Sequence, residues 1–296
     1  MRTPRILLAV DGRPASTAAI RWTAGRPGRA RSQIDIVSVA TDDDVLLDDA
    51  RSAVAAARAE VLRLARDAQV TTSVPRGNVF DVLVELSASA DLLVVGSDRP
   101  SPLGAFLHAG LPMRLTGRVQ CRLAVVPAGW SGDPGTTIAV GWDDGGAAAA
   151  AVDAAADEAE TAGLPLHIHH VWSPVPVARY DLAGGAELTA AVEEDERLAL
   201  ARVVRETAAR FPHVEVSGEL HRGSGGAGIL GYASQAALIV VGSHRRSTIG
   251  ELLVGATSDD LIAGSSEVPV LVTPPASARS DDHQDDDDDH EDRDES

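Results

Sequence analysis

The feature that most constrains the fold of this chain is an internal repeat of short apolar segments. The segment 6–11 is repeated at 138–143, 132 residues later, and both copies end in Asp. The segment 92–97 is repeated at 238–243, 146 residues later, and the closing apolar segments keep this spacing. Matches in a constant order predict two copies of one structural unit. The longer spacing indicates an insertion in the second copy, within the Pro- and Gly-rich stretch 173–185.

Each copy alternates short Val, Ile and Leu segments with longer Ala-, Glu- and Arg-rich segments of helical period. Continuous apolar strands are buried on both faces, which indicates a parallel sheet covered by helices. Right-handed crossovers then give a doubly wound arrangement. We therefore expect an α/β chain of two tandem doubly wound domains, each with a five-stranded parallel sheet. The expected strands lie near 5–10, 34–39, 70–75, 92–96 and 122–126, and near 137–142, 166–171, 213–220, 237–242 and 269–273.

The repeat also predicts the domain boundaries. We expect a first domain at 1–128, a linker at 129–135, a second domain at 136–276 and a tail at 277–296. The tail is a run of Asp and His that cannot bury apolar surface, so we expect it to be disordered and to act as a solvating segment. Weak metal buffering by its histidines and carboxylates is the alternative.

Charge and cysteine content exclude several classes of function. The formal net charge is −18, of which the tail from residue 281 contributes −10, so the rest is mildly acidic and has no basic stripe for nucleic acid. The single cysteine, Cys121, cannot form an intrachain disulfide, which favours a reducing compartment. The apolar stretch 6–10 is too short for a signal-peptide core or a membrane span. We expect a cytoplasmic protein with no membrane or nucleic-acid partner.

Both copies resemble the universal stress protein family, over roughly 3–128 and 136–275. The resemblance rests on the first strand ending Val-Asp-Gly, on the Val-Val-Gly-Ser strand ends and on the closing segment 269–272. The resemblance implies a protein that senses stress or regulates the response to it, rather than an enzyme. It also implies that the last strands of the two domains pair, setting 123–126 against 270–273, and it leaves dimerisation of whole chains open.

Nucleotide-binding members of that family carry Gly-x-x-Gly, nine residues and then Gly-Ser/Thr after the fourth strand, so the resemblance implies ATP with magnesium as the ligand. In the second copy Gly242 is followed by Arg245 in place of the second glycine, and Gly255 by Ala256 in place of the hydroxyl residue. Arg245 either closes the loop or reaches a phosphate. Thr257 and Ser258, directly after Ala256, offer hydroxyl groups in its place. The nucleotide-binding residues expected in this copy are Gly141, Asp143, Val171, Gly242, Arg245, Gly255, Ala256, Thr257 and Ser258.

The first copy departs further from the motif. Arg99 again replaces the second glycine, and Asp98 adds a charge that repels phosphate. Prolines at 100, 102 and 112 remove backbone donors that a phosphate needs. We therefore expect a degenerate site in this copy. Its residues would be Asp11, Val39, Gly96 and Gly110.

The Asp residues that end the first strand of each copy have two readings. Asp11 and Asp143 fall at the carboxyl end of a strand, where ligands of open α/β sheets bind, and the resemblance places them near adenine and ribose. Asp is also a good cap for the helix that follows. The two roles are compatible.

Other signals are set aside. The glycines at 223–228 match Gly-x-Gly-x-x-Gly, but the end of the next strand lacks the carboxylate that a dinucleotide site needs. Strand alternation puts His167 and His169 on one face and His170 on the other, with no evident partner cluster, so no metal site is expected. Cys121 enters an apolar strand and is expected in the core.

Two further classes of function stay open beside the nucleotide-binding regulator. A nucleotide-independent protein-interaction module would explain the altered loops of both copies. A weak ATPase or a nucleotide-dependent transferase is the enzymatic alternative, although no nucleophile with a general base beside it can be named.

Overall fold

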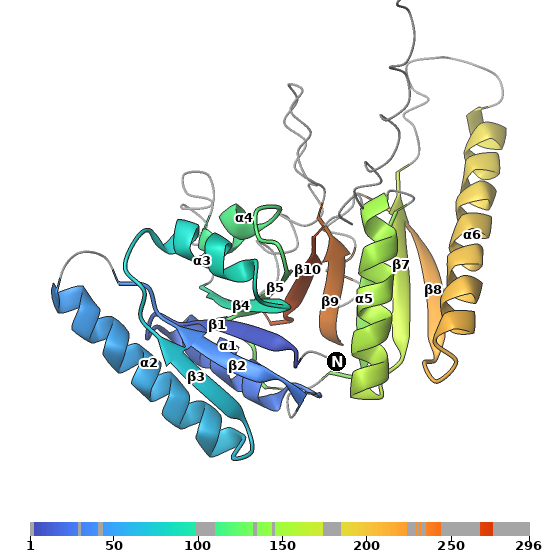
Figure 1. Cartoon of the computed structure of the whole chain (residues 1–296). Helices are drawn as coiled ribbons and strands as arrows, with labels where there is room; N and C mark the ends of the chain where they lie inside the picture. Colours follow the sequence, from blue (N-terminus) through green and yellow to red (C-terminus); the bar gives the residue numbers. More distant parts are fainter. Residues whose placement is uncertain are drawn as a thin grey trace, which may run out of the picture.

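A computed structural model describes residues 3–28, 31–40, 44–98, 110–132, 135–143, 146–173, 185–223, 229, 231, 235–243 and 267–274. Within these ranges the strands form one ten-stranded sheet in the order β3-β2-β1-β4-β5-β10-β9-β6-β7-β8 (Figure 1). The strands are β1 (Arg5–Ala9), β2 (Gln33–Val37), β3 (Gln69–Ser73), β4 (Leu92–Ser97), β5 (Arg122–Pro127), β6 (Thr137–Trp142), β7 (Leu166–Trp172), β8 (Val216–Arg222), β9 (Ala236–Gly242) and β10 (Val270–Thr273). The helices are α1 (Pro14–Gly25), α2 (Asp44–Leu64), α3 (Val79–Ser87), α4 (Leu111–Leu115), α5 (Gly146–Ala162) and α6 (Gly185–Arg210).

The two halves of the sheet are copies of one another. β3-β2-β1-β4-β5 and β8-β7-β6-β9-β10 have the same order, and the strands within each half are parallel. Every expected strand is present, with small shifts at the ends. The largest shift is in β8, expected at 213–220, which begins only at Val216 because a turn precedes it, where the Val214 amide donates to the Phe211 carbonyl at 3.0 Å.

The halves join where the last strand of each lies against the other. β10 pairs with β5 in antiparallel register, with Val270 opposite Val125 and Val272 opposite Leu123. The predicted pair of five-stranded sheets is therefore continuous across the junction. Because this one ladder is antiparallel, the strands of the two halves point in opposite directions.

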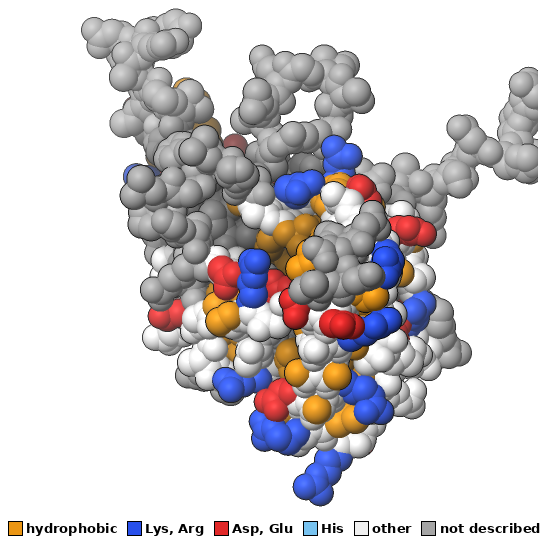
Figure 2. Space-filling view, turned by 90° about the vertical axis from the view of Figure 1, so that its left-hand side faces the viewer, with side chains coloured by type: hydrophobic (Ala, Val, Ile, Leu, Met, Phe, Trp, Pro, Cys, Tyr) orange, Lys and Arg blue, Asp and Glu red, His pale blue; other side chains and the backbone are white. Residues whose placement is uncertain are grey.

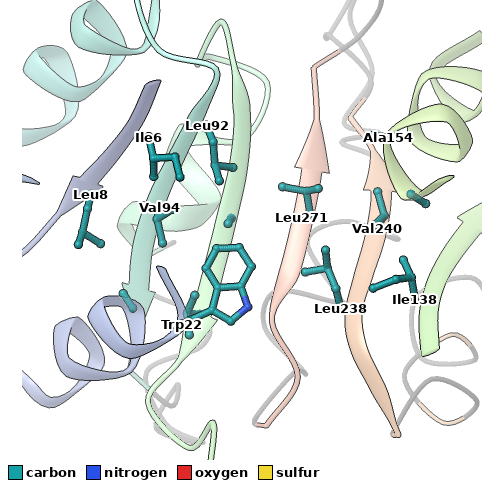
Figure 3. Packing of buried hydrophobic residues seen from close by; sticks show 14 of the residues in the cluster. Ile6, Leu8, Trp22, Leu92, Val94, Ile138, Ala154, Leu238, Val240 and Leu271 are labelled. Carbon is teal, nitrogen blue, oxygen red and sulfur yellow. The ribbon is translucent and has the colours of Figure 1, made fainter. Parts of the chain in front are cut away.

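Two apolar clusters cover the two faces of the sheet. The first contains residues of α1, α2, α5 and α6, and the second contains Leu83 of α3 and Leu115 of α4. The first cluster runs across the junction, since Trp22 of α1, Leu271 of β10 and Ile138 of β6 all belong to it (Figure 3). The apolar strand residues are thus buried on both faces, as their continuous pattern predicts.

An ion pair also links the halves. Arg26, directly after α1, places its guanidinium 2.5 Å from the Glu158 carboxylate of α5, and both side chains are nearly buried, at 14% and 12% exposure. The same guanidinium lies 4.8 Å from the centre of the Trp22 ring. Removing one partner of a buried ion pair strongly destabilises the folded protein, because the other charge is left buried without compensation.

On the face nearest α2 and β3, the arginines and carboxylates drawn in Figure 2 are interspersed rather than gathered by sign. None of the helices in the described ranges has the length and apolar character needed to cross a bilayer.

Candidate functional site

Ligands of open α/β sheets bind at the carboxyl ends of the strands, at the point where the strand order reverses. This point falls between β1 and β4 in the first half and between β6 and β9 in the second. Because the strands of the two halves point in opposite directions, these two positions lie at opposite ends of the strands, on opposite sides of the sheet.

In the first half, Asp11 is engaged by its own turn. Its Oδ1 accepts hydrogen bonds from the Ser16 hydroxyl at 2.6 Å and from the Arg13 amide at 3.0 Å, and the Ser16 hydroxyl also accepts from the Asp11 amide at 3.0 Å. The helix-cap reading is wrong for Asp11, since the N-cap of α1 is Arg13, which makes no side-chain cap. Asp11 instead fixes the turn just before it.

Gly96, near the end of β4, serves packing. A Cβ at this position would lie 2.4 Å from both the carbonyl carbon and the oxygen of Ala15, so the start of α1 occupies the space that the glycine leaves. Val39 follows β2 and packs partly buried against the second cluster. Gly110 is the N-cap residue of the five-residue helix α4, and among the described residues the atom nearest to a Cβ there would be Pro112 Cδ, at 3.7 Å.

In the second half, the described site residues lie around the ends of β6, β7 and β9. Gly141 is the fifth residue of β6, Asp143 follows that strand, Val171 lies in β7 and Gly242 ends β9. A Cβ at Gly141 would meet the side-chain end of Ile229 at 2.5 Å. The remaining predicted residues lie outside the described ranges: Arg245, Gly255, Ala256, Thr257 and Ser258.

Ser243, directly after Gly242, is a site residue that the sequence prediction omits. It is 3% exposed, its amide donates to the Thr273 carbonyl at 2.9 Å, and its hydroxyl has no hydrogen-bond partner among the described residues. Leaving a buried hydroxyl unpaired costs about 1–3 kcal/mol. The matching residue of the first half, Ser97, is only partly buried, and its hydroxyl lies 3.4 Å from the Asp98 carbonyl oxygen. The second half alone therefore has a buried, unpaired hydroxyl at this point.

The repeat differs at the first turn as well. Ser16, whose hydroxyl holds Asp11, corresponds to Ala148 at the spacing of 132 residues. An alanine has no hydroxyl, so Ala148 cannot make the bond to Asp143 that Ser16 makes to Asp11. The two halves share a fold but differ in the groups at their ligand edges.

The histidines of β7 lie on opposite faces of the sheet, as the alternation predicts. His170 faces α6, where its Nε2 lies 2.9 Å from a Glu196 carboxylate oxygen and its Nδ1 lies 2.8 Å from the Trp142 carbonyl oxygen. His169 faces the other way, and its Nδ1 lies 3.0 Å from Nε2 of His221. Burial, together with the nearby His221, lowers the pKa of His169 to about 4. The partner cluster that the sequence does not reveal is thus supplied by β8.

Two signals set aside in the sequence are also located. Cys121 is buried, and burial raises the pKa of its thiol to about 11, so it is an unreactive core residue. Of the glycine-rich segment, Gly223 donates its amide to the Trp172 carbonyl at 3.0 Å, and 224–228 lie outside the described ranges.

Comparison with known proteins identifies the family. A family model described as the universal stress protein family matches residues 3–127 and 136–274. A universal stress protein of Mycolicibacterium smegmatis is 28% identical over 289 residues, which cover 91% of this chain and 97% of that protein. One of Mycobacterium tuberculosis is 26% identical over 287 residues, covering 90% and 96%.

A solved structure has the same fold over nearly the whole chain. The crystal structure of a universal stress protein from Archaeoglobus fulgidus superimposes with a TM-score of 0.68 at 18% identity, covering 93% of this chain and 97% of that one. The family matches and this shared fold agree with the repeated strand order. The chain belongs to the universal stress protein family and carries its domain twice in tandem.

Proposed function

We propose that this protein is a stress-response regulator that binds an adenine nucleotide, ATP with magnesium, in its second domain. The observation that carries the proposal is the buried, unpaired hydroxyl of Ser243 at the carboxyl end of β9. A buried hydroxyl without a partner is rare in native proteins, and a ligand oxygen is one group that satisfies it. The residue follows Gly242, at the edge where open α/β sheets bind ligands.

The first domain is the structural partner in this proposal. The space beside its Gly96 is occupied by the start of α1. Its Asp11 accepts hydrogen bonds from the Ser16 hydroxyl and the Arg13 amide. The space beside Gly96 is therefore closed to a phosphate, and Oδ1 of Asp11 already accepts two hydrogen bonds within its own turn. The β5–β10 ladder supports pairing of the two domains within one chain, so association of whole chains has to use another surface.

Binding rather than turnover is the proposed activity. Cys121 and Ser16, two potential nucleophiles, are both buried, and the hydroxyl of Ser16 already donates to Asp11. A weak ATPase activity is the enzymatic alternative, and release of phosphate from ATP measures it directly. The single buried thiol is consistent with the proposed cytoplasmic location, because it requires no oxidising compartment.

A pair of matched serine variants tests the nucleotide site. Ser243→Ala should weaken binding of ATP and magnesium by about 2- to 12-fold, as expected for one hydrogen bond worth about 0.5–1.5 kcal/mol. It should not lower the melting temperature of the ligand-free protein, because the hydroxyl has no partner to lose. Ser97→Ala, at the matching position of the first domain, should leave the affinity unchanged.

Small molecules extracted from the purified protein and identified by mass spectrometry give an independent test. Bound adenine nucleotide, together with a rise in melting temperature on adding ATP and magnesium, supports the proposal. Extracts without nucleotide and an unchanged melting temperature would refute it and favour a nucleotide-independent interaction module.

A further inference from the structure

Three side chains with metal-binding atoms meet on one face of the second domain. They are His169 of β7 and Glu219 and His221 of β8, and their ligand atoms all lie within 4.8 Å of one another. The β7–β8 register explains the meeting, because His169 is paired with Glu219 and His221 lies two residues further along the same face. We propose that this cluster, which we call the β7–β8 triad, binds a divalent transition-metal ion, with zinc as the best match.

The distances within the β7–β8 triad suit such an ion. His169 Nδ1 lies 3.0 Å from His221 Nε2, and this Nε2 lies 3.8 Å from a Glu219 carboxylate oxygen. Tetrahedral zinc, with bonds of about 2.0–2.2 Å, places its ligand atoms about 3.3–3.5 Å apart. The two observed separations lie on either side of this value. Shifts of roughly half an ångström bring these two pairs to ligand spacing, and the third pair, His169 with Glu219, lies within 4.8 Å and is adjusted by rotation of the exposed Glu219 side chain.

The donor set selects the class of metal. Two imidazole nitrogens and one carboxylate oxygen form a ligand set found in zinc enzymes, whereas magnesium and calcium prefer oxygen ligands alone. Imidazole also suits copper and nickel. The affinities of divalent metals for the triad are therefore expected to follow the general order of nitrogen-containing sites, which rises through nickel to copper and falls at zinc. Magnesium bound with a nucleotide should therefore not compete for the β7–β8 triad.

The contact between the two rings and the exposure of the carboxylate also favour metal binding. Both imidazole side chains are buried, with His169 at 4% and His221 at 6% exposure. The two rings face each other through nitrogen atoms at hydrogen-bond distance, which requires a proton on one of them. A bound cation takes the place of that proton. Glu219 is 70% exposed in its side chain, so the triad has a flexible carboxylate on its solvent side.

The β7–β8 triad shares no residue with the proposed nucleotide site. Val171 of that site is in register with His221, but the Ser243 hydroxyl that carries the nucleotide proposal follows β9, and β6 separates β7 from β9 in the sheet. Zinc binding can therefore fail while nucleotide binding succeeds, and the reverse also holds.

The full chain provides the test, because its tail also contains two histidines, at 283 and 290, whose imidazoles compete with the β7–β8 triad for zinc in the proposal's alternative outcome. Zinc affinity is measured by competition with a chromophoric chelator, and Co²⁺ in place of zinc reports the ligand geometry through its visible absorption. We expect one zinc ion bound per chain with an affinity that His221→Ala and Glu219→Gln each reduce by at least about tenfold. Replacing the exposed His213 by Ala, and separately both tail histidines, should leave this affinity unchanged.

Glu219→Gln is the deciding variant because an exposed carboxylate is not needed for folding. Circular dichroism and the melting temperature confirm that each variant is folded. If folded Glu219→Gln binds zinc with the same affinity as the unaltered chain, the proposal of a metal site at the β7–β8 triad is overturned. Loss of the strong zinc ion on replacing the tail histidines alone would assign it to the tail and overturn the proposal as well.

Discussion

Leu271 provides a direct test of how the two domains are held together. It lies in the four-residue strand β10, is fully buried at 0% exposure, and is opposite Ala124 of β5 on one side and Val240 of β9 on the other. Leu271→Ala removes three buried carbons, which corresponds to about 2.4 kcal/mol of transfer free energy. The cavity left between the halves adds to this, so we expect a total loss of about 3–5 kcal/mol.

Thermal unfolding followed by circular dichroism or calorimetry measures this loss. For a chain of this size, about 3 kcal/mol should lower the melting temperature by roughly 6–12 °C. Leu198→Ala is the matched control, because Leu198 is 59% exposed on α6 and its removal should change stability by less than about 0.5 kcal/mol. Equal melting temperatures for the Leu271 variant and the unaltered chain would refute the inference that β10 lies between the two domains as a shared core strand.

Three further substitutions test other features of the fold. Glu158→Gln should destabilise the protein by about 3 kcal/mol, because it leaves the nearly buried Arg26 guanidinium without its anion. Gly96→Ala should destabilise by at least about 1–3 kcal/mol, since its Cβ would overlap the backbone of α1, whereas Gly25→Ala has open space and should be neutral or stabilising. Burial acts to raise the pKa of Asp35, but hydrogen bonds from Thr71, Arg5 and Gln33 outweigh it, and the pKa is lowered from 3.8. A lowered carboxyl pKa stabilises the fold above pH 3.8 and loses this contribution as the pH falls through the folded-state pKa, so Asp35→Asn should destabilise at pH 7 and much less at pH 3.

Chemical denaturation at controlled pH measures all three substitutions. Glu206→Gln, in an exposed pair with Arg202 on α6, is the control for Glu158 and should cause no measurable change. A Glu158 variant that behaves like this control would contradict the role of the ion pair. An Asp35 variant equally destabilised at pH 3 and pH 7 would show that the lowered pKa makes no contribution.

The strands could be predicted from the sequence because each is a continuous apolar run, and the repeat fixed their number and order. The continuity of the sheet followed only from the family resemblance, since apolar runs such as 122–127 and 270–273 do not say which strand they face. The antiparallel orientation of these two strands is given by the structure, in which Val270 is opposite Val125 and Val272 is opposite Leu123.

The candidate site was harder to predict, for physical reasons. Gly96 was expected in a degenerate nucleotide site, but the sequence does not show that the backbone of Ala15 in α1 lies within 2.4 Å of where its Cβ would be. Ser243 was omitted because burial and the lack of a partner are properties of the fold. His169 and His221 are 52 residues apart, and only the pairing of β7 with β8 brings them together. Alternation within β8, which places Glu219 and His221 on one face, was the available signal.

The antiparallel β5–β10 ladder has a consequence for how such a chain can diverge. In two separate identical chains the same contact would be isologous, and every change in one domain would appear in both. Here the segment between β5 and β6 tethers the domains, so each meets its partner at an effective concentration on the order of millimolar. The tether makes the pairing of two unlike domains obligatory, which frees one domain to lose ligand contacts while it continues to support the other.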